Sequence, residues 1–80
     1  MKLNEVIHYH ELDRPVMTPE AIAEKHGVSL AKVKDQLRMG IKIEMKEHTS
    51  HRNVAERIAL SHIGDIADYY TKLKRLVDPD

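Results

Sequence analysis

The sequence predicts an all-α protein, a compact bundle of four or five short helices with an N-terminal helix-turn-helix-like corner. Apolar residues recur at the spacing of one helical face over most of the chain. Prolines, glycines and capping residues divide these stretches into short segments, and a chain of 80 residues has room for one domain. We therefore expect a single domain over residues 1–80, with an N-terminal segment (1–17), the corner (18–39) and the helices that follow (40–77).

Composition narrows the class of protein. The chain has no cysteine, so disulfides and thiolate metal sites are excluded, and without Phe or Trp its core must be largely aliphatic. Thirteen basic and thirteen acidic residues cancel, which argues against a protein whose main task is to coat nucleic acid. No signal-peptide core or membrane-spanning run is present in the sequence, so a soluble intracellular protein is the default expectation.

The first elements have local start and stop signals. A short helix is compatible with the apolar positions of residues 3–12. A turn or extended connection is expected over residues 13–17, because Pro15 and Pro19 interrupt regular structure. Thr18 can cap a helix that begins at Pro19, and Gly27 can end it. Ser29 can cap the next helix, whose predicted apolar stripe is Leu30, Val33, Leu37, Ile41 and Met45.

Gly40 leaves two interpretations of the segment that follows it. The letters "IKIEM" (41–45) alternate with period two, which is typical of a short strand. The helical stripe nevertheless continues through Gly40 in phase, and no partner strand is apparent elsewhere. We prefer a helix, with a bend at Gly40, since glycine costs a helix about 1 kcal/mol relative to alanine.

Two more helices complete the predicted bundle. Thr49 or Ser50 can cap the first of them and Gly64 can end it, while Asp65 can cap the last helix. The first has Val54, Ala55, Ile58, Ala59, His62 and Ile63 on one face, and the last has the stripe Ile66, Tyr69, Tyr70, Leu73, Leu76 and Val77.

The segment "AIAEKHGVSLAKVKDQL" (21–37) has the pattern of a helix-turn-helix corner. The small Ala23 permits a close crossing, Gly27 takes the turn, and apolar residues fill the space between the helices. In DNA-binding versions the second helix enters the major groove. The candidate contacts are Lys32, Lys34, Gln36 and Arg38, and residues 24–46 carry a net charge of +3. Such a corner is also a common packing solution without nucleic acid, and we favour that explanation.

Three of the six histidines lie in "KEHTSHRNVAERIALSH" (46–62). We expect His48 to close one helix, His51 to face solvent and His62 to lie on an inner face, bonded to a backbone carbonyl or to Glu47. A metal site would need Glu44, His48 and His62, but no HExxH-like spacing supports it. Catalysis is the least favoured interpretation because no nucleophile or paired carboxylate accompanies the histidines. We therefore favour a hydrogen-bonded polar corner and expect no metal or cofactor.

About fifty residues resemble a small domain of unknown function that is encoded largely by tailed bacteriophages and their hosts. The shared motifs are Gly-Ile-Lys-Val-Glu, Glu-His-Thr, Ala-x-x-Ile-Ala-x-x-His and Tyr-Tyr-x-Lys-Leu, matched here by residues 40–44, 47–49, 55–62 and 69–73. The chain departs from the pattern at Ser61, where an acidic residue is usual, and at Ile66-Ala67, where Asp-Pro is usual. The first departure weakens any role of an acidic ligand or base at that position.

The resemblance implies a compact helical module of phage origin, and it implies no activity. With the residue patterns, it leads us to expect a non-enzymatic binding module in the host cytoplasm or the virion, without a membrane. The expected partner is a protein, as for a virion or assembly component or a host-interaction factor. Nucleic acid is the alternative partner and a metal the second. The residues assigned to the shared polar corner are Glu47, His48, Thr49, His62, Tyr69 and Tyr70.

Overall fold

The computed structural model describes residues 16–77 and contains four helices in that range. They are α2 (Pro19–His26), α3 (Leu30–Glu47), α4 (Arg52–Asp65) and α5 (Tyr69–Val77). The prediction of an all-α bundle is therefore confirmed. The expected helix within residues 3–12 lies outside the described residues, as do most of the connection at 13–17 and the C-terminal Pro79.

The corner between α2 and α3 forms as its local signals predict. The Thr18 hydroxyl accepts a hydrogen bond from the Ala21 amide, and the Ser29 hydroxyl accepts one from the Lys32 amide. Gly27 ends α2 in the left-handed conformation, with φ of 65°, which a residue without a Cβ adopts at little cost. The two helices bury Ile22 and Val33 between them.

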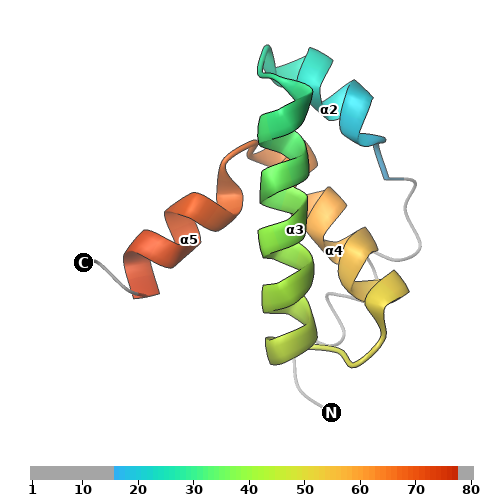
Figure 1. The fold of residues 1–80 in the computed structure, drawn as a ribbon, viewed down its shortest axis with the longest axis vertical. Coiled ribbons are helices and arrows are strands. Elements are labelled where there is room, and N and C mark those ends of the chain that lie inside the picture. The colour runs from blue at the N-terminus through green and yellow to red at the C-terminus, as the bar shows by residue number, and fades with distance from the viewer. Residues whose placement is uncertain (1–15, 78–80) are drawn as a thin grey trace.

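The long helix α3 is the centre of the bundle (Figure 1) and runs without a break through Gly40. The helical interpretation of residues 41–45 is thus confirmed and the strand alternative is wrong. Gly40 is required by packing: a Cβ at this position would lie 2.4 Å from Cε2 of Tyr70 and 2.8 Å from Cβ of Ala59. Three helices therefore meet at one glycine, which lets α4 and α5 approach α3 closely.

The helix α4 crosses α3 at an inclined angle (Figure 1) and supplies much of the core. Its predicted inner face is confirmed by the buried residues Ala55, Ile58, Ala59 and Ile63. The predicted cap is wrong: α4 begins at Arg52, and His51 is its N-cap residue without a side-chain cap bond. The Thr49 hydroxyl accepts the His51 amide instead, so it stabilises the turn before the helix.

The junction between α4 and α5 also differs from the prediction. Asp65 does not cap the last helix, because α4 continues past Gly64 to Asp65 and α5 begins only at Tyr69. Ile66 is extended, with φ of −134° and ψ of 106°, and this breaks the helix. The Tyr70 amide, in the first turn of α5, donates to Oε1 of Gln36 on α3 at 3.0 Å. The Gln36 side chain, distant in sequence, thus accepts a first-turn amide of α5 in place of the local cap that was expected.

The helix α5 extends away from the other three helices (Figure 1). Tyr70, at its start, is completely buried, whereas Leu76, near its end, is 83% exposed. None of the described helices is both long and apolar enough to cross a membrane.

Candidate functional site

The chemically richest place among the described residues surrounds the carboxylate of Glu44 on α3. Glu44 is only 3% exposed, although it is charged in its ordinary state. The Tyr70 hydroxyl donates a hydrogen bond of 2.7 Å to its Oε2. Burying a carboxylate is costly unless it is hydrogen-bonded, so the Tyr70 hydroxyl is a necessary part of this arrangement.

Two histidines stand on either side of the same carboxylate. Nε2 of His48 lies 3.8 Å from Oε1 of Glu44, and Nε2 of His62 lies 3.9 Å from Oε2. Both separations exceed hydrogen-bond length, so the contacts are electrostatic when an imidazole is protonated. The two imidazoles are about one quarter exposed, which places them between the buried carboxylate and solvent.

The aromatic rings at the start of α5 complete the cluster. The His62 ring stacks on the Tyr69 ring, with centroids 4.4 Å apart and planes 7° from parallel. Tyr69 and Tyr70 meet edge to face at 4.8 Å. We call Glu44, His48, His62, Tyr69 and Tyr70 the α5 joint, because their contacts attach the first turn of α5 to α3 and α4.

The joint contains most of the residues predicted for the polar corner, but its acidic residue is a different glutamate. His48, His62, Tyr69 and Tyr70 come together as the sequence predicts, but Glu47 is exposed and the carboxylate belongs to Glu44. Thr49 is half-buried, and its hydroxyl is used in the adjacent turn. His48 closes α3 and His51 is exposed, as predicted.

The sequence contains a signal for the burial of Glu44. Glu44 continues the helical face that carries Leu37, Gly40 and Ile41, at a spacing of three to four residues. A charged residue in phase with an apolar stripe indicates a buried charge that needs a partner. Its partner Tyr70 is 26 residues away in the sequence, and no local pattern connects the two.

The chemistry available at the joint is limited. Oε1 of Glu44 is buried and has no hydrogen-bond partner within the described part of the chain. Within residues 16–77, no group of three or more His, Cys, Asp or Glu side chains is placed so that it could hold a metal ion. The geometry that the joint does provide is mechanical: it fixes the start of α5 by a buried hydrogen bond and stacked rings.

The candidate nucleic-acid contacts on α3 lie in different environments. Lys32 and Lys34 are exposed, and Arg38 forms an ion pair with Asp35. The Gln36 side chain is used within the protein: its Nε2 donates to the Thr71 hydroxyl at 2.5 Å, and its Oε1 accepts the Tyr70 amide. One of the four predicted contacts is therefore an attachment point of α5.

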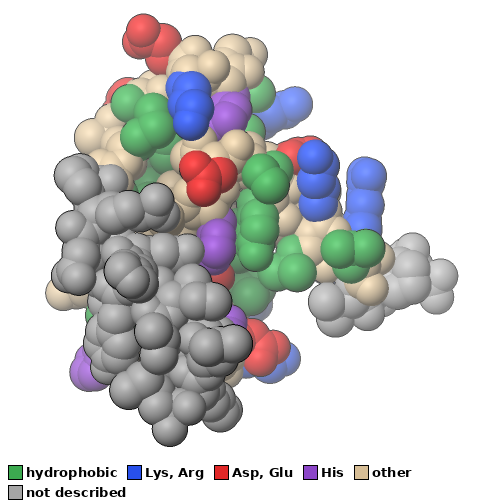
Figure 2. Space-filling model, turned by 180° about the vertical axis from the view of Figure 1, so that it is seen from behind, with side chains coloured by type: hydrophobic (Ala, Val, Ile, Leu, Met, Phe, Trp, Pro, Cys, Tyr) green, Lys and Arg blue, Asp and Glu red, His purple; other side chains and the backbone are tan. Residues whose placement is uncertain are grey.

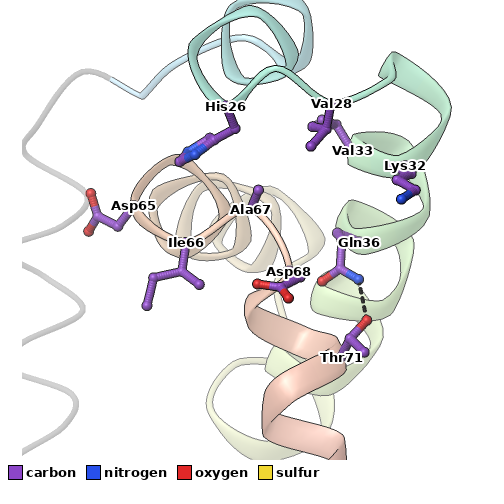
Figure 3. A pocket seen from close by; sticks show the side chains of 10 residues that line it. All are labelled: His26, Val28, Lys32, Val33, Gln36, Asp65, Ile66, Ala67, Asp68 and Thr71. Atoms are coloured by element: carbon purple, nitrogen blue, oxygen red, sulfur yellow. Dashed lines mark hydrogen bonds between the residues drawn. The ribbon is translucent and has the colours of Figure 1, made fainter.

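A groove of about 710 Å³ lies beside this part of α3. Figure 3 shows Lys32 and Gln36 on one wall, with Ile66 and Asp68 from the α4–α5 connection opposite them. Asp65, the last residue of α4, also lines the groove, but its carboxylate points away from Lys32. At the upper end, Lys25 Nζ and His26 Nε2 each lie 2.8 Å from the Gly64 carbonyl oxygen, which ties the end of α2 to the end of α4. The groove thus carries charges of both signs.

A comparison with known proteins identifies the family but no close relative. No curated protein and no solved structure was found to match the chain. The model of a protein family of unknown function (DUF5661) matches residues 19–78, which include all four described helices and the whole α5 joint. The chain therefore belongs to this family, a domain of unknown function.

Proposed function

We propose that this domain is a non-enzymatic binding module that recognises a partner protein through α5. The observation that carries the proposal is the exposure of Leu76, which is 83% accessible on a helix that extends from the body of the domain. Leu73 precedes it on the same helical face and is only half-buried. An apolar stripe that continues beyond the core is a feature of helices that dock into a groove of another protein.

The α5 joint supports this role by fixing the helix before a partner arrives. Binding orders flexible groups at a cost, and a helix that is already held in place avoids part of that cost. Tyr70 is completely buried and bonded to Glu44, while Gln36 holds the first turn from α3. The attachment extends as far as Leu73, which packs against the core, and it leaves the last turn to the partner.

Protein is favoured over DNA as the partner by the surroundings of α3. A helix that reads the major groove needs free polar side chains, and the surface around it must not repel the DNA phosphates. Gln36 is occupied by α5, and Asp68 lines the groove opposite Lys32. Its carboxylate would lie near a DNA backbone docked on the first turns of α3, and its charge opposes it.

The resemblance to phage-encoded domains adds a biological setting to the proposal. In that setting the domain acts in virion assembly or in contact with a host factor, and its partner is present in infected cells. The proposal includes no cofactor and no reaction.

The test is capture from infected-cell lysate, followed by binding measurements with the purified partner. We expect Leu76→Ala to raise the Kd at least about tenfold, the effect of losing one buried anchor. The matched control is Lys34→Ala, which removes an exposed side chain on α3, away from α5. Equal Kd values for wild type and Leu76→Ala would overturn the proposal, as would duplex DNA binding that weakens steeply with salt in place of protein binding.

A further inference from the structure

We infer that the partner of α5 is an acidic protein surface: an apolar groove whose edges carry carboxylates. This inference rests on the proposed function and adds the chemistry of the partner. The segment "YYTKLKRLV" (69–77) contains three basic residues and no acidic one, although the whole chain is neutral. The helix that exposes Leu76 therefore also carries a concentration of positive charge.

The basic residues stand beside the exposed stripe. On a helix, Leu73 and Leu76 share a face, Lys72 lies at one edge of it, and Lys74 and Arg75 lie further round the helix, each about 100° from the nearer leucine. Figure 2 shows basic side chains next to hydrophobic ones along α5. A partner that buries the leucines would thus meet the Lys72 ammonium group at the rim of the contact, and an edge of the partner that reaches round α5 would meet Lys74 and Arg75. Charge complementarity at such rims sets orientation and the rate of encounter.

These cations are not committed to strong ion pairs within the described residues. Lys72 lies 3.5 Å from Asp68, but both side chains are more than half exposed, and such surface pairs contribute little. Lys74 and Arg75 are exposed and take part in no ion pair among residues 16–77. All three can turn to a partner's carboxylates at small cost.

The combination of apolar and basic side chains distinguishes among partners. A second copy of α5 would offer leucines but would bring six cations together, which opposes self-association. Nucleic acid would offer negative charge but no apolar surface for Leu73 and Leu76. A membrane would offer both, yet two leucine side chains bury fewer carbons than a single myristoyl chain, which alone binds membranes only marginally. An acidic groove on a protein satisfies both requirements.

The experiment uses the full chain and three synthetic helical peptides with the same leucine seam, flanked by Glu, Gln or Lys. Binding is measured by fluorescence anisotropy at about 50 and about 300 mM NaCl. We expect the Glu peptide to bind at least about tenfold more tightly than the Gln peptide at low salt. The Lys peptide should bind most weakly, and the difference should shrink at high salt.

Variants separate the roles of charge and apolar contact. Lys74→Glu/Arg75→Glu should reverse the preference between the Glu and Lys peptides, whereas Leu76→Ala should weaken binding of all three. Asp78 and Asp80 follow α5 in the sequence, outside the described residues; Asp78→Asn/Asp80→Asn should tighten binding of the Glu peptide by removing like charge.

The outcomes distinguish failure of the inference from failure of the proposed function. Equal affinity for the Glu and Gln peptides, together with dependence on Leu76, overturns the acidic partner and leaves protein binding intact. Loss of the Leu76 dependence overturns both. Absence of any peptide binding at ~100 µM, an affinity weaker than that of useful transient contacts, also overturns the inference. So does preferential binding to phosphatidylserine vesicles or duplex DNA, or self-association in sedimentation.

Discussion

The two ends of α5 differ in almost every physical respect, although they are only one to two turns apart. At the first turn, Tyr70 is completely buried, its ring touches the α3 backbone at Gly40, and its hydroxyl bonds to Glu44. Near the last turn, Leu76 is 83% exposed and Lys74 and Arg75 are in solvent. The contrast indicates a division of tasks: the first end attaches the helix, and the second end is available to a partner.

Gly40→Ala, at the attached end of α5, is expected to change the free energy of unfolding most. A Cβ would lie 2.4 Å from the Tyr70 ring and 2.8 Å from Ala59, so α4 or α5 must move. We expect the free energy of unfolding to fall by about 3 kcal/mol, the upper range for overpacking, despite the better helix propensity of alanine. Chemical denaturation followed by circular dichroism measures it.

Gly64→Ala is the matched control for this substitution. Gly64 is also buried and helical, but a Cβ there would meet only Met17 Sδ, at an ordinary 3.7 Å. We expect unchanged or slightly higher stability. A similar loss for both variants would show that the effect at Gly40 is not specific to the crossing.

Tyr70→Phe is expected to have the next largest effect, because it removes the donor to a buried carboxylate. Hydrogen bonds to charged groups contribute about 1.5–3 kcal/mol, and Glu44 would retain no hydrogen-bond partner for either oxygen among the described residues. We expect a loss of about 2 kcal/mol in the free energy of unfolding.

A double-mutant cycle checks the cause of that loss. In the Glu44→Met background the Tyr70→Phe substitution should cost little, because no buried charge is left without a donor. Strict additivity of the two substitutions would contradict a direct interaction between Tyr70 and Glu44.

His62→Ala should have a smaller effect, about 1 kcal/mol, since it removes the stack on Tyr69. His48→Ala should cost less, because His48 approaches Glu44 only at 3.8 Å and its side chain is more exposed than that of His62. Thermal melts of both variants measure the difference, with His51→Ala as the exposed control. Unchanged melting temperatures for both His48→Ala and His62→Ala would argue against a stabilising role of the joint histidines.

Features fixed by residues close in sequence could be predicted, whereas features fixed by contacts between distant residues could not. The α2–α3 corner was predictable because Thr18, Gly27 and Ser29 bond to groups no more than four residues away. The start of α5 was not, because its cap is Gln36, 34 residues away. The local sequence favours Asp65 as the cap because its carboxylate can accept a backbone amide, but Asp65 is the last residue of the preceding helix.

The candidate site shows the same limit. The two histidines and two tyrosines of the predicted corner lie around a buried carboxylate, but this carboxylate belongs to Glu44 and the sequence pattern indicated Glu47. The two glutamates lie three residues apart on one helix, so a motif alone does not separate them. The position of Tyr70, set by the missing side chain of Gly40, decides which carboxylate is buried.

The most direct test of the central claim compares Leu73→Ala with Leu76→Ala in the free energy of unfolding. Alanine keeps the helix propensity high in both variants, so the difference reports how far each side chain is packed. Leu73 is half-buried against the core and should cost about 1–2 kcal/mol, whereas Leu76, 83% exposed, should cost less than about 0.5 kcal/mol. Equal losses for the two variants would contradict the account, because the end of α5 would then be packed against the domain and unavailable to a partner.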